Sequence, residues 1–173
     1  MTACNACYQK YSIENAQKFS WKCINCKGAI KKGVKDRIME LATLPENRHP
    51  AFRPKYTHFI PLAEIIQAAL GLENPNGVKA QAIWRELVER FGTEIKVLVD
   101  TPIEEIKEAN PVVGKKMESF RKGYVTYIPG GGGEYGKPLI CDSEKEFNAK
   151  KEEVEKTLTT ELSMHGQKRL GDF

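Results

Sequence analysis

The sequence has no long apolar run and very few histidines. Nowhere in its 173 residues is there a stretch approaching the roughly twenty apolar residues that cross a bilayer, so we expect no membrane span. No basic segment followed by an apolar one opens the chain, which argues against a secretory signal and predicts a cytoplasmic protein. The three histidines, His49, His58 and His165, stand in unrelated contexts, so we predict no His/Asp/Glu cluster suited to a hydrolytic metal site.

Cysteine is also scarce, but four of the five cysteines form a pattern. They read C-x2-C, fifteen residues, C-x2-C: Cys4, Cys7, Cys23 and Cys26. This spacing predicts a zinc site, and four protein ligands leave no open position for chemistry, so the zinc should be structural. Two disulfides would need an oxidising compartment, and a redox pair would open a helix of a βαβ unit, which this stretch does not resemble. The fifth, Cys141, is expected to be a small buried hydrophobe.

Positive charge gathers at the front of the chain. The whole sequence has 27 basic and 23 acidic residues, for a net charge of +4. Residues 1–60 hold 11 of the basic and 4 of the acidic residues, whereas the remainder is slightly acidic. A basic end on a zinc module indicates nucleic-acid binding, and a lysine-rich solvated surface is the alternative.

Candidate phosphate contacts follow the second cysteine pair. A helix is predicted after Gly33 to about residue 41, beside a cationic strip formed by Lys31, Lys32, Lys35 and Arg37. Phosphate contacts and a plain exposed helix start explain this strip equally well. The proline-rich connection at 43–57 adds Arg53 as a further candidate contact.

Aromatic residues surround the cysteines. Tyr8, Tyr11, Phe19 and Trp21 are expected to pack over the metal site, because a ribbon this small has little other core. Stacking of one of them on a base is the less favoured alternative.

The middle of the chain is predicted to be helical. Apolar residues at three–four spacing predict helices over about 61–71 and 78–91, and 94–99 is predicted to be a short strand or an extended connection. Two further helices are expected around a turn at 110–114. This pair loosely resembles a helix-hairpin-helix, with Lys115, Lys116 and Arg121 as candidate DNA contacts. The second hairpin glycine is missing, which favours an ordinary helical hairpin.

A glycine-rich hairpin is predicted over about 124–140. Residues 131–137 fit G-x-x-x-x-G-K, the start of a P-loop, but Pro138 stands where a serine or threonine should bind magnesium, and no helix is predicted to follow. We therefore expect no nucleotide site. A hairpin that approaches a nucleic-acid backbone or a neighbouring domain, or a plain solvent loop, remains open.

These patterns predict an α+β fold: a four-cysteine zinc ribbon, a mainly helical domain with a small glycine-rich β-hairpin, and a C-terminal helix. The expected divisions are the ribbon with its following helix (1–42), the proline-rich connection (43–57), the helical domain with its hairpin (58–141), a charged helix beginning with the capping box at Ser143 (142–163) and a disordered tail (164–173). The first ligand is the fourth residue, so we expect the ribbon to belong inside a longer polypeptide.

The order of motifs resembles the C-terminal region of the endonuclease Q family. The resemblance rests on the cysteine pairs, on I-K-K-G-V-K-D-R-I at 30–38, on H-F-I-P-L-A-E-I-I at 58–66, on V-T-Y-I-P-G at 125–130 and on Y-G-K at 135–137. It implies a DNA-repair endonuclease that nicks beside deaminated bases or abasic sites, in which an N-terminal PHP-type metal domain cuts and the zinc and helical parts hold DNA. Bacterial relatives are often catalogued as UvrD-like DNA helicases.

The resemblance therefore implies a DNA-binding, damage-recognition fragment that needs the missing PHP domain for catalysis. A protein-interaction module of a repair or replication assembly is the alternative function. The tail adds Gln167, Leu170 and Phe173, whose pattern resembles a sliding-clamp peptide with a spacing one residue longer than usual.

Overall fold

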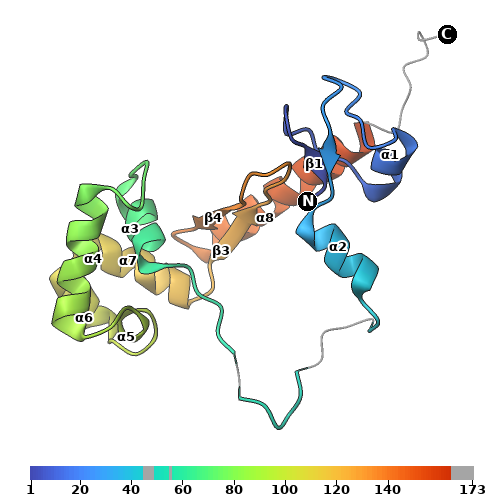
Figure 1. The fold of residues 1–173 in the computed structure, drawn as a ribbon. Helices are drawn as coiled ribbons and strands as arrows, with labels where there is room; N and C mark the ends of the chain where they lie inside the picture. Colours follow the sequence, from blue (N-terminus) through green and yellow to red (C-terminus); the bar gives the residue numbers. More distant parts are fainter. Residues whose placement is uncertain (45–48, 55, 165–173) are drawn as a thin grey trace. The chain divides into compact units, whose positions relative to one another are not determined.

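The computed structural model describes residues 1–44, 49–54 and 56–164. The described residues divide into two compact units (Figure 1). Unit 1 comprises Met1–Pro54, Tyr127–Lys137 and Glu152–Phe173, and unit 2 comprises Lys55–Thr126 and Pro138–Lys151, apart from the residues outside those ranges. Eight helices and two small sheets in the described ranges confirm the predicted α+β class. None of the described helices is both long and apolar enough to span a membrane.

The front of unit 1 is a small ribbon. Strand β1 (Ala3–Cys4) pairs antiparallel with β2 (Ile30–Lys31), with Cys4 opposite Ile30. Between them lies α1 (Ile13–Lys18), whose start is capped by the Ser12 side chain accepting a hydrogen bond from Asn15 N, as the sequence predicts. The ribbon has its own core, made of Cys4, Tyr11, Ala16, Cys23 and Ile30 with Phe19 and Trp21 packed against it.

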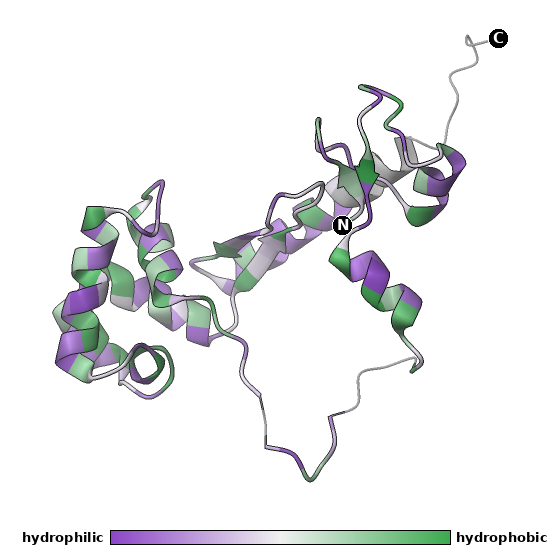
Figure 2. Cartoon of the chain, viewed as in Figure 1, coloured by the Kyte–Doolittle hydropathy of each residue, from purple (hydrophilic) through white to green (hydrophobic). Residues whose placement is uncertain are grey.

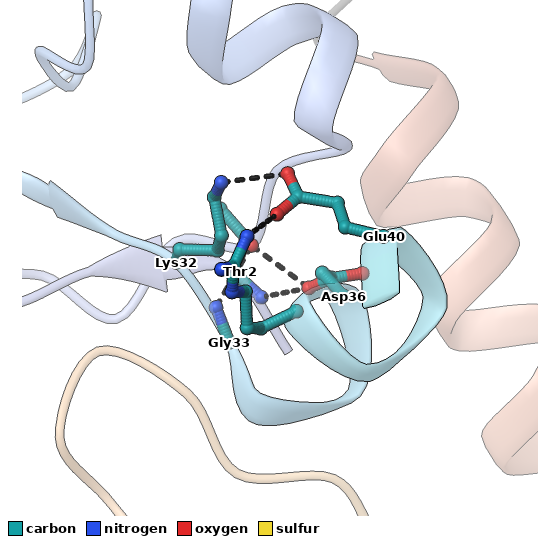
Figure 3. Close-up of polar contacts among 6 residues, drawn as sticks. Thr2, Lys32, Gly33, Asp36 and Glu40 are labelled. Carbon is teal, nitrogen blue, oxygen red and sulfur yellow. Dashed lines mark hydrogen bonds and ion pairs between the residues drawn. The ribbon is translucent and has the colours of Figure 1, made fainter. Parts of the chain in front are cut away.

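Helix α2 (Val34–Leu41) follows the ribbon and is tied to it by the buried residue Thr2 (Figure 3). The Asp36 carboxylate accepts hydrogen bonds from the Thr2 backbone N–H at 2.7 Å and from its hydroxyl at 2.8 Å. The Thr2 hydroxyl in turn accepts from Gly33 N at 2.9 Å, which satisfies a backbone donor at the helix start. One turn further on, Lys32 pairs with Glu40 at 2.6 Å. The start of α2 is thereby fixed relative to β1 and β2.

Unit 2 has a helical core. Its helices are α3 (Leu62–Leu70), α4 (Val78–Phe91), α5 (Glu94–Val99), α6 (Ile103–Ala109) and α7 (Pro111–Arg121). The longer ones alternate hydrophobic and hydrophilic bands along the ribbon, as amphipathic helices do (Figure 2). Their apolar faces bury Ile60, Leu62, Ile65, Ile66, Ala80, Leu87, Val97, Leu98, Ile106, Val113, Met117 and Ile140. The predicted helices over 61–71 and 78–91 are confirmed, and Trp84 packs against this core.

Two local predictions in unit 2 are wrong. Residues 94–99 form helix α5 and no strand, because the Thr93 side chain accepts from Lys96 N and caps the start. The predicted turn at 110–114 is the beginning of α7. Asn110 caps that helix by accepting from Val113 N at 3.1 Å, and Pro111 occupies its first position.

Gly114 therefore lies inside a helix. It is buried, and a Cβ atom there would lie 2.7 Å from the Lys107 backbone nitrogen. The glycine lets α6 and α7 pack closely, and Asn110 alone connects them.

The predicted hairpin is formed by β3 (Val125–Ile128) and β4 (Lys137–Ile140). Strand β4 begins at Lys137, so a strand stands where a P-loop would have a helix; the expectation of no nucleotide site stays a prediction. Helix α8 (Glu144–Met164) then starts at the Ser143 cap, whose hydroxyl accepts from Glu146 N at 3.2 Å. Cys141, just before it, is buried as predicted.

Candidate metal centre and basic surface

Four sulfur atoms gather at the end of the ribbon. The Sγ atoms of Cys4, Cys7, Cys23 and Cys26 all lie within 4.8 Å of one another. Cys4 Sγ lies 3.5 Å from Cys26 Sγ, and Cys7 Sγ lies 3.5 Å from Cys23 Sγ. A tetrahedral ion with metal–sulfur bonds of about 2.3 Å would hold its sulfur atoms about 3.8 Å apart. The four cysteines can therefore hold one metal ion.

Each cysteine pair forms the same backbone turn. In the first turn Cys4 N donates to Gln9 O at 2.9 Å and Tyr8 N donates to Cys4 O at 3.1 Å. In the second turn Cys23 N donates to Gly28 O at 2.8 Å and Lys27 N donates to Cys23 O at 2.9 Å. The two halves of the site are thus built alike from residues far apart in the sequence.

Both turns need a left-handed residue directly after the second cysteine. Tyr8 has φ of 59° and Lys27 has φ of 62°, a backbone region that costs about 1–2 kcal/mol for a residue with a side chain. Gly28 follows Lys27, and a Cβ there would lie 3.0 Å from Cys4 Sγ and 3.2 Å from Cys26 Sγ. A side chain at position 28 would therefore press on the sulfur cluster.

The buried Tyr11 side chain supports one sulfur. Its hydroxyl accepts a hydrogen bond from Ile24 N at 3.3 Å and lies 3.1 Å from Cys23 Sγ. A Cys23 thiolate can only accept, so the hydroxyl donates its proton to that form of the sulfur. Burial alone would raise the pKa of Cys23, but the hydrogen bond from Tyr11 and those from nearby backbone N–H groups outweigh it and lower the pKa to about 6. Such a thiol is readily present as the thiolate that a metal requires.

The cationic strip lies on unit 1 and is exposed. Lys31 ends β2, and Lys35 and Arg37 lie on the first turns of α2. Arg37 pairs with Glu40 at 2.8 Å, the carboxylate that also binds Lys32. Within the described ranges, no ion pair is found for Lys31 or Lys35. Arg53 also belongs to unit 1, where its guanidinium carbon lies 6.0 Å from the centre of the Phe52 ring.

The other candidate cations belong to unit 2, and two of them are engaged inside it. Lys116 Nζ donates to Ile140 O at 3.1 Å and pairs with Asp142 at 2.5 Å. Arg121 donates from Nε to Leu98 O at 2.9 Å and from Nη2 to Val97 O at 2.8 Å, at the end of α5. Lys115 is exposed. The clamp-like residues Gln167, Leu170 and Phe173 lie outside the described residues.

These contacts predict that Arg121 contributes to stability more than to DNA binding. Arg121→Ala would leave two carbonyls at the end of α5 without their charged donor, and hydrogen bonds to charged groups contribute about 1.5–3 kcal/mol. We expect a loss of that size in the free energy of unfolding by urea, with DNA affinity of the folded chain nearly unchanged. Lys115→Ala, on the same helix, is the matched control and should change stability by less than about 0.5 kcal/mol. Unchanged stability with a large loss of DNA affinity in Arg121→Ala would contradict this.

Sequence reasoning does not anticipate where the glycine hairpin packs. Its tip lies on the ribbon: Met1 N donates to Gly130 O at 3.0 Å, and a Cβ at Gly132 would lie 2.2 Å from Cys4 O. A hollow of about 270 Å³ opens between the two, lined by Tyr8, Lys10, Ile128, Pro129, Gly130, Gly131, Glu134, Tyr135 and Lys137. The run of four glycines indicates that the backbone approaches another surface closely, but the neighbouring sequence does not indicate which surface.

Comparisons with known proteins agree with this architecture. Residues 61–124 match the family model described as the MJ0043 C-terminal domain. The uncharacterised protein MJ0043 of Methanocaldococcus jannaschii is 42% identical over 140 residues, which is 79% of this chain and 17% of that protein.

Two solved structures are also similar. The lesion-specific endonuclease PfuEndoQ of Pyrococcus furiosus is 40% identical with a TM-score of 0.70, over 86% of this chain and 38% of that one. Endonuclease Q in complex with a 27-mer duplex substrate, with an abasic lesion at the active site, is 42% identical with a TM-score of 0.72, over 85% and 36%. This chain thus spans well under half the length of these relatives. The resemblance to the C-terminal region of the endonuclease Q family is confirmed.

Proposed function

We propose that this chain is the DNA-binding and damage-recognition part of a repair endonuclease that acts at deaminated bases or abasic sites. One observation carries the proposal: 40–42% identity, over some 85% of this chain, to endonuclease Q, one structure of which contains a duplex with an abasic lesion. At that identity and TM-score the fold is shared, so a common role in holding DNA is the most direct explanation.

Zinc is the metal that the four-cysteine site suits best. Thiolates bind zinc strongly, and four protein ligands leave no position for water or substrate. The ion would hold the two equivalent turns of the ribbon together and take no part in bond cleavage. Cutting would be the task of the PHP-type metal domain that the family resemblance implies, supplied by the part of the protein that this chain does not span.

The exposed cations of unit 1 are the proposed phosphate contacts. Lys31 lies on β2 opposite Ala3, and Lys35 lies on the first turn of α2, whose start is fixed by the Thr2–Asp36 hydrogen bonds. Fixed cations of this kind raise the affinity of a protein for DNA, because their contacts with phosphates release counterions. These contacts do not depend on the DNA sequence. The proposed phosphate contacts also include Lys32, Arg37, Arg53 and Lys115. Lys116 and Arg121 would add to the positive electrostatic potential more than they would contact phosphates directly.

Salt dependence of DNA binding tests this proposal. We expect the zinc-loaded chain to bind duplex DNA with an affinity that falls steeply with salt. Lys31→Gln/Lys35→Gln should make the slope of log K against log salt shallower by about 1.8, because each lost phosphate contact removes about 0.9. Lys145→Gln/Lys151→Gln, which removes two exposed lysines of α8, is the matched control. Equal slopes for both double variants would exclude the strip as a contact surface.

One observation favours the alternative of a protein-interaction module. Helix α2 exposes Val34, Ile38 and Leu41 to 76%, 60% and 61%, and buries none of its residues. Exposed apolar faces of this kind mark interaction surfaces. Absence of DNA binding at low salt would favour this function, with a repair or replication protein as partner. A sliding clamp is one candidate partner, because the tail pattern at Gln167, Leu170 and Phe173 resembles a clamp-binding peptide. Unchanged clamp binding after deletion of residues 167–173 would refute this partner.

A further inference from the structure

We propose that the exposed apolar face of α2 pairs with an acidic amphipathic helix of a partner protein. The inference goes beyond the proposed DNA-binding function and gives a chemical class to the partner of the alternative function. The face is formed by Val34, Ile38 and Leu41, and none of the eight residues of α2 is buried. Hydrophobic and hydrophilic bands alternate along this helix (Figure 2). Since a packed helix normally covers its apolar band, a helix that presents one to solvent indicates a partner.

The opposite face of α2 is already engaged by the ribbon. Asp36 accepts two hydrogen bonds from Thr2. Glu40 pairs with Lys32 at 2.6 Å (Figure 3). Asp36 stands two residues from Ile38, and residues two apart do not share a face of a helix. The ribbon therefore contacts the acidic face of α2, while the apolar face stays exposed. Because the start of the helix is fixed, little further freedom is lost when it binds.

The spacing of the apolar residues indicates that the partner is a helix. Ile38 follows Val34 by four residues, and Leu41 follows Ile38 by three. This alternation of four and three is the seam of a heptad repeat, with Ile38 at position a and the other two residues at positions d. Such a seam is completed by the apolar stripe of a second helix, whose side chains fit between its own. The two turns of α2 offer a short seam, so the affinity depends on charge as well as on apolar contact.

The charges beside the seam select an acidic partner. In the same heptad Lys35 falls at position e and Arg37 at position g, so a cation lies on each side of the apolar residues. Among the residues that the structure describes, no ion pair is found for Lys35, while Arg37 pairs with Glu40. A second copy of α2 would present the same two cations at its flanks and no carboxylate to pair with them. Glutamate or aspartate at the flanks of a partner helix would pair with both. Lys35 is also a proposed phosphate contact, so the partner helix and DNA would compete for it.

Two designed peptides test this inference on the zinc-loaded full chain. Each is about three heptads long with leucine at positions a and d, and positions e and g are all glutamate in one peptide and all lysine in the other. We expect the glutamate peptide to bind with an affinity that falls as salt rises, and the lysine peptide not to bind. Binding is measured by the fluorescence anisotropy of the labelled peptide. Two-dimensional NMR spectra should show the largest shifts at α2.

Ile38→Ala removes the central residue of the seam without changing the charge of the helix, and alanine favours a helix. We expect it to weaken binding of the glutamate peptide about ten-fold, because three fewer carbon atoms leave water when the pair forms. Ile95→Ala is the matched control, because Ile95 is an isoleucine of α5 with the same exposure of 60%. Both variants should bind duplex DNA like the wild type.

Several results would overturn the pairing with an acidic helix. These are equal binding of the glutamate peptide to wild type and Ile38→Ala, equal binding of the two peptides to the wild type, and no binding of either peptide. Concentration-dependent dimers that Ile38→Ala abolishes would overturn it by assigning the face to a second copy, and weaker duplex binding in Ile38→Ala would overturn it by assigning the face to DNA. Salt-sensitive duplex binding by the wild type would leave the proposed function standing in each of these cases, and its absence would overturn that function alone.

Discussion

Replacing Cys23 by serine is expected to abolish metal binding and unfold the ribbon, while the helical core of unit 2 stays folded. Two of the five buried residues in the small core of the ribbon, Cys4 and Cys23, are candidate metal ligands. Structural zinc contributes about 10–16 kcal/mol of apparent binding free energy in zinc-finger peptides, far more than this core could replace. The core of unit 2 is built from other residues and does not depend on the metal.

The measurement is zinc content per chain together with heteronuclear NMR spectra before and after the substitution. Signals of the ribbon should collapse to the narrow range of an unfolded segment, while those of unit 2 should keep their dispersion. Cys141→Ser is the matched control, because it removes a buried thiol that is not part of the metal group and whose pKa is raised by burial. One zinc ion per chain with a folded ribbon in Cys23→Ser would contradict the assignment.

Gly132→Ala is expected to separate the glycine hairpin from the ribbon. The new Cβ would lie 2.2 Å from Cys4 O and 3.0 Å from the Cys4 carbonyl carbon, so backbone must move on one side or the other. The residue also has φ of 68°, which disfavours a side chain by about 1–2 kcal/mol. Overpacking costs about 1–3 kcal/mol more, so we expect the free energy of unfolding of unit 1 to fall by about 3 kcal/mol in total.

Gly71→Ala is the control that separates the cost of backbone strain from the cost of the clash between a Cβ at position 132 and Cys4. Gly71 has φ of 61°, nearly that of Gly132, but a Cβ atom added there would meet no other atom within 4 Å. It should therefore cost only the backbone strain of about 1–2 kcal/mol in a urea titration. The hollow beside Tyr8 should also be lost in Gly132→Ala and kept in Gly71→Ala. Equal destabilisation in the two variants would contradict packing of the hairpin on the ribbon.

Much of the helical structure follows from local signals in the sequence. The apolar spacing of α4 is strong enough that its predicted bounds of 78–91 match the structure. Helix α5 escapes prediction because six residues are too few for a period to appear, although Thr93 carries a cap signal. At 110–114, Asn and Pro indicate a turn, whereas a capping Asn followed by Pro is also the ordinary beginning of a helix.

The metal site could be predicted, but its surroundings could not. Two cysteines separated by two residues are brought together by a local turn, so their spacing alone predicts a metal site. The role of a cation depends instead on which carbonyls and carboxylates the fold places near it. Arg121 donates hydrogen bonds to the carbonyl oxygens of Val97 and Leu98, which are more than twenty residues away in the sequence. Likewise the contact of Met1 with Gly130 joins residues 129 apart in the chain. No local pattern encodes such contacts, so the hollow beside Tyr8 emerges only from the folded chain.

Binding of the zinc-loaded chain to matched duplexes tests the central claim most directly. The duplexes differ at one position only, which is an abasic site, a uracil, a hypoxanthine or an undamaged nucleotide, and binding is measured at a low and a higher salt concentration. Damage recognition by this chain predicts tighter binding to at least one lesion at both salt concentrations, with all affinities falling as salt rises. Equal affinity for all four duplexes, or no binding at low salt, would contradict it.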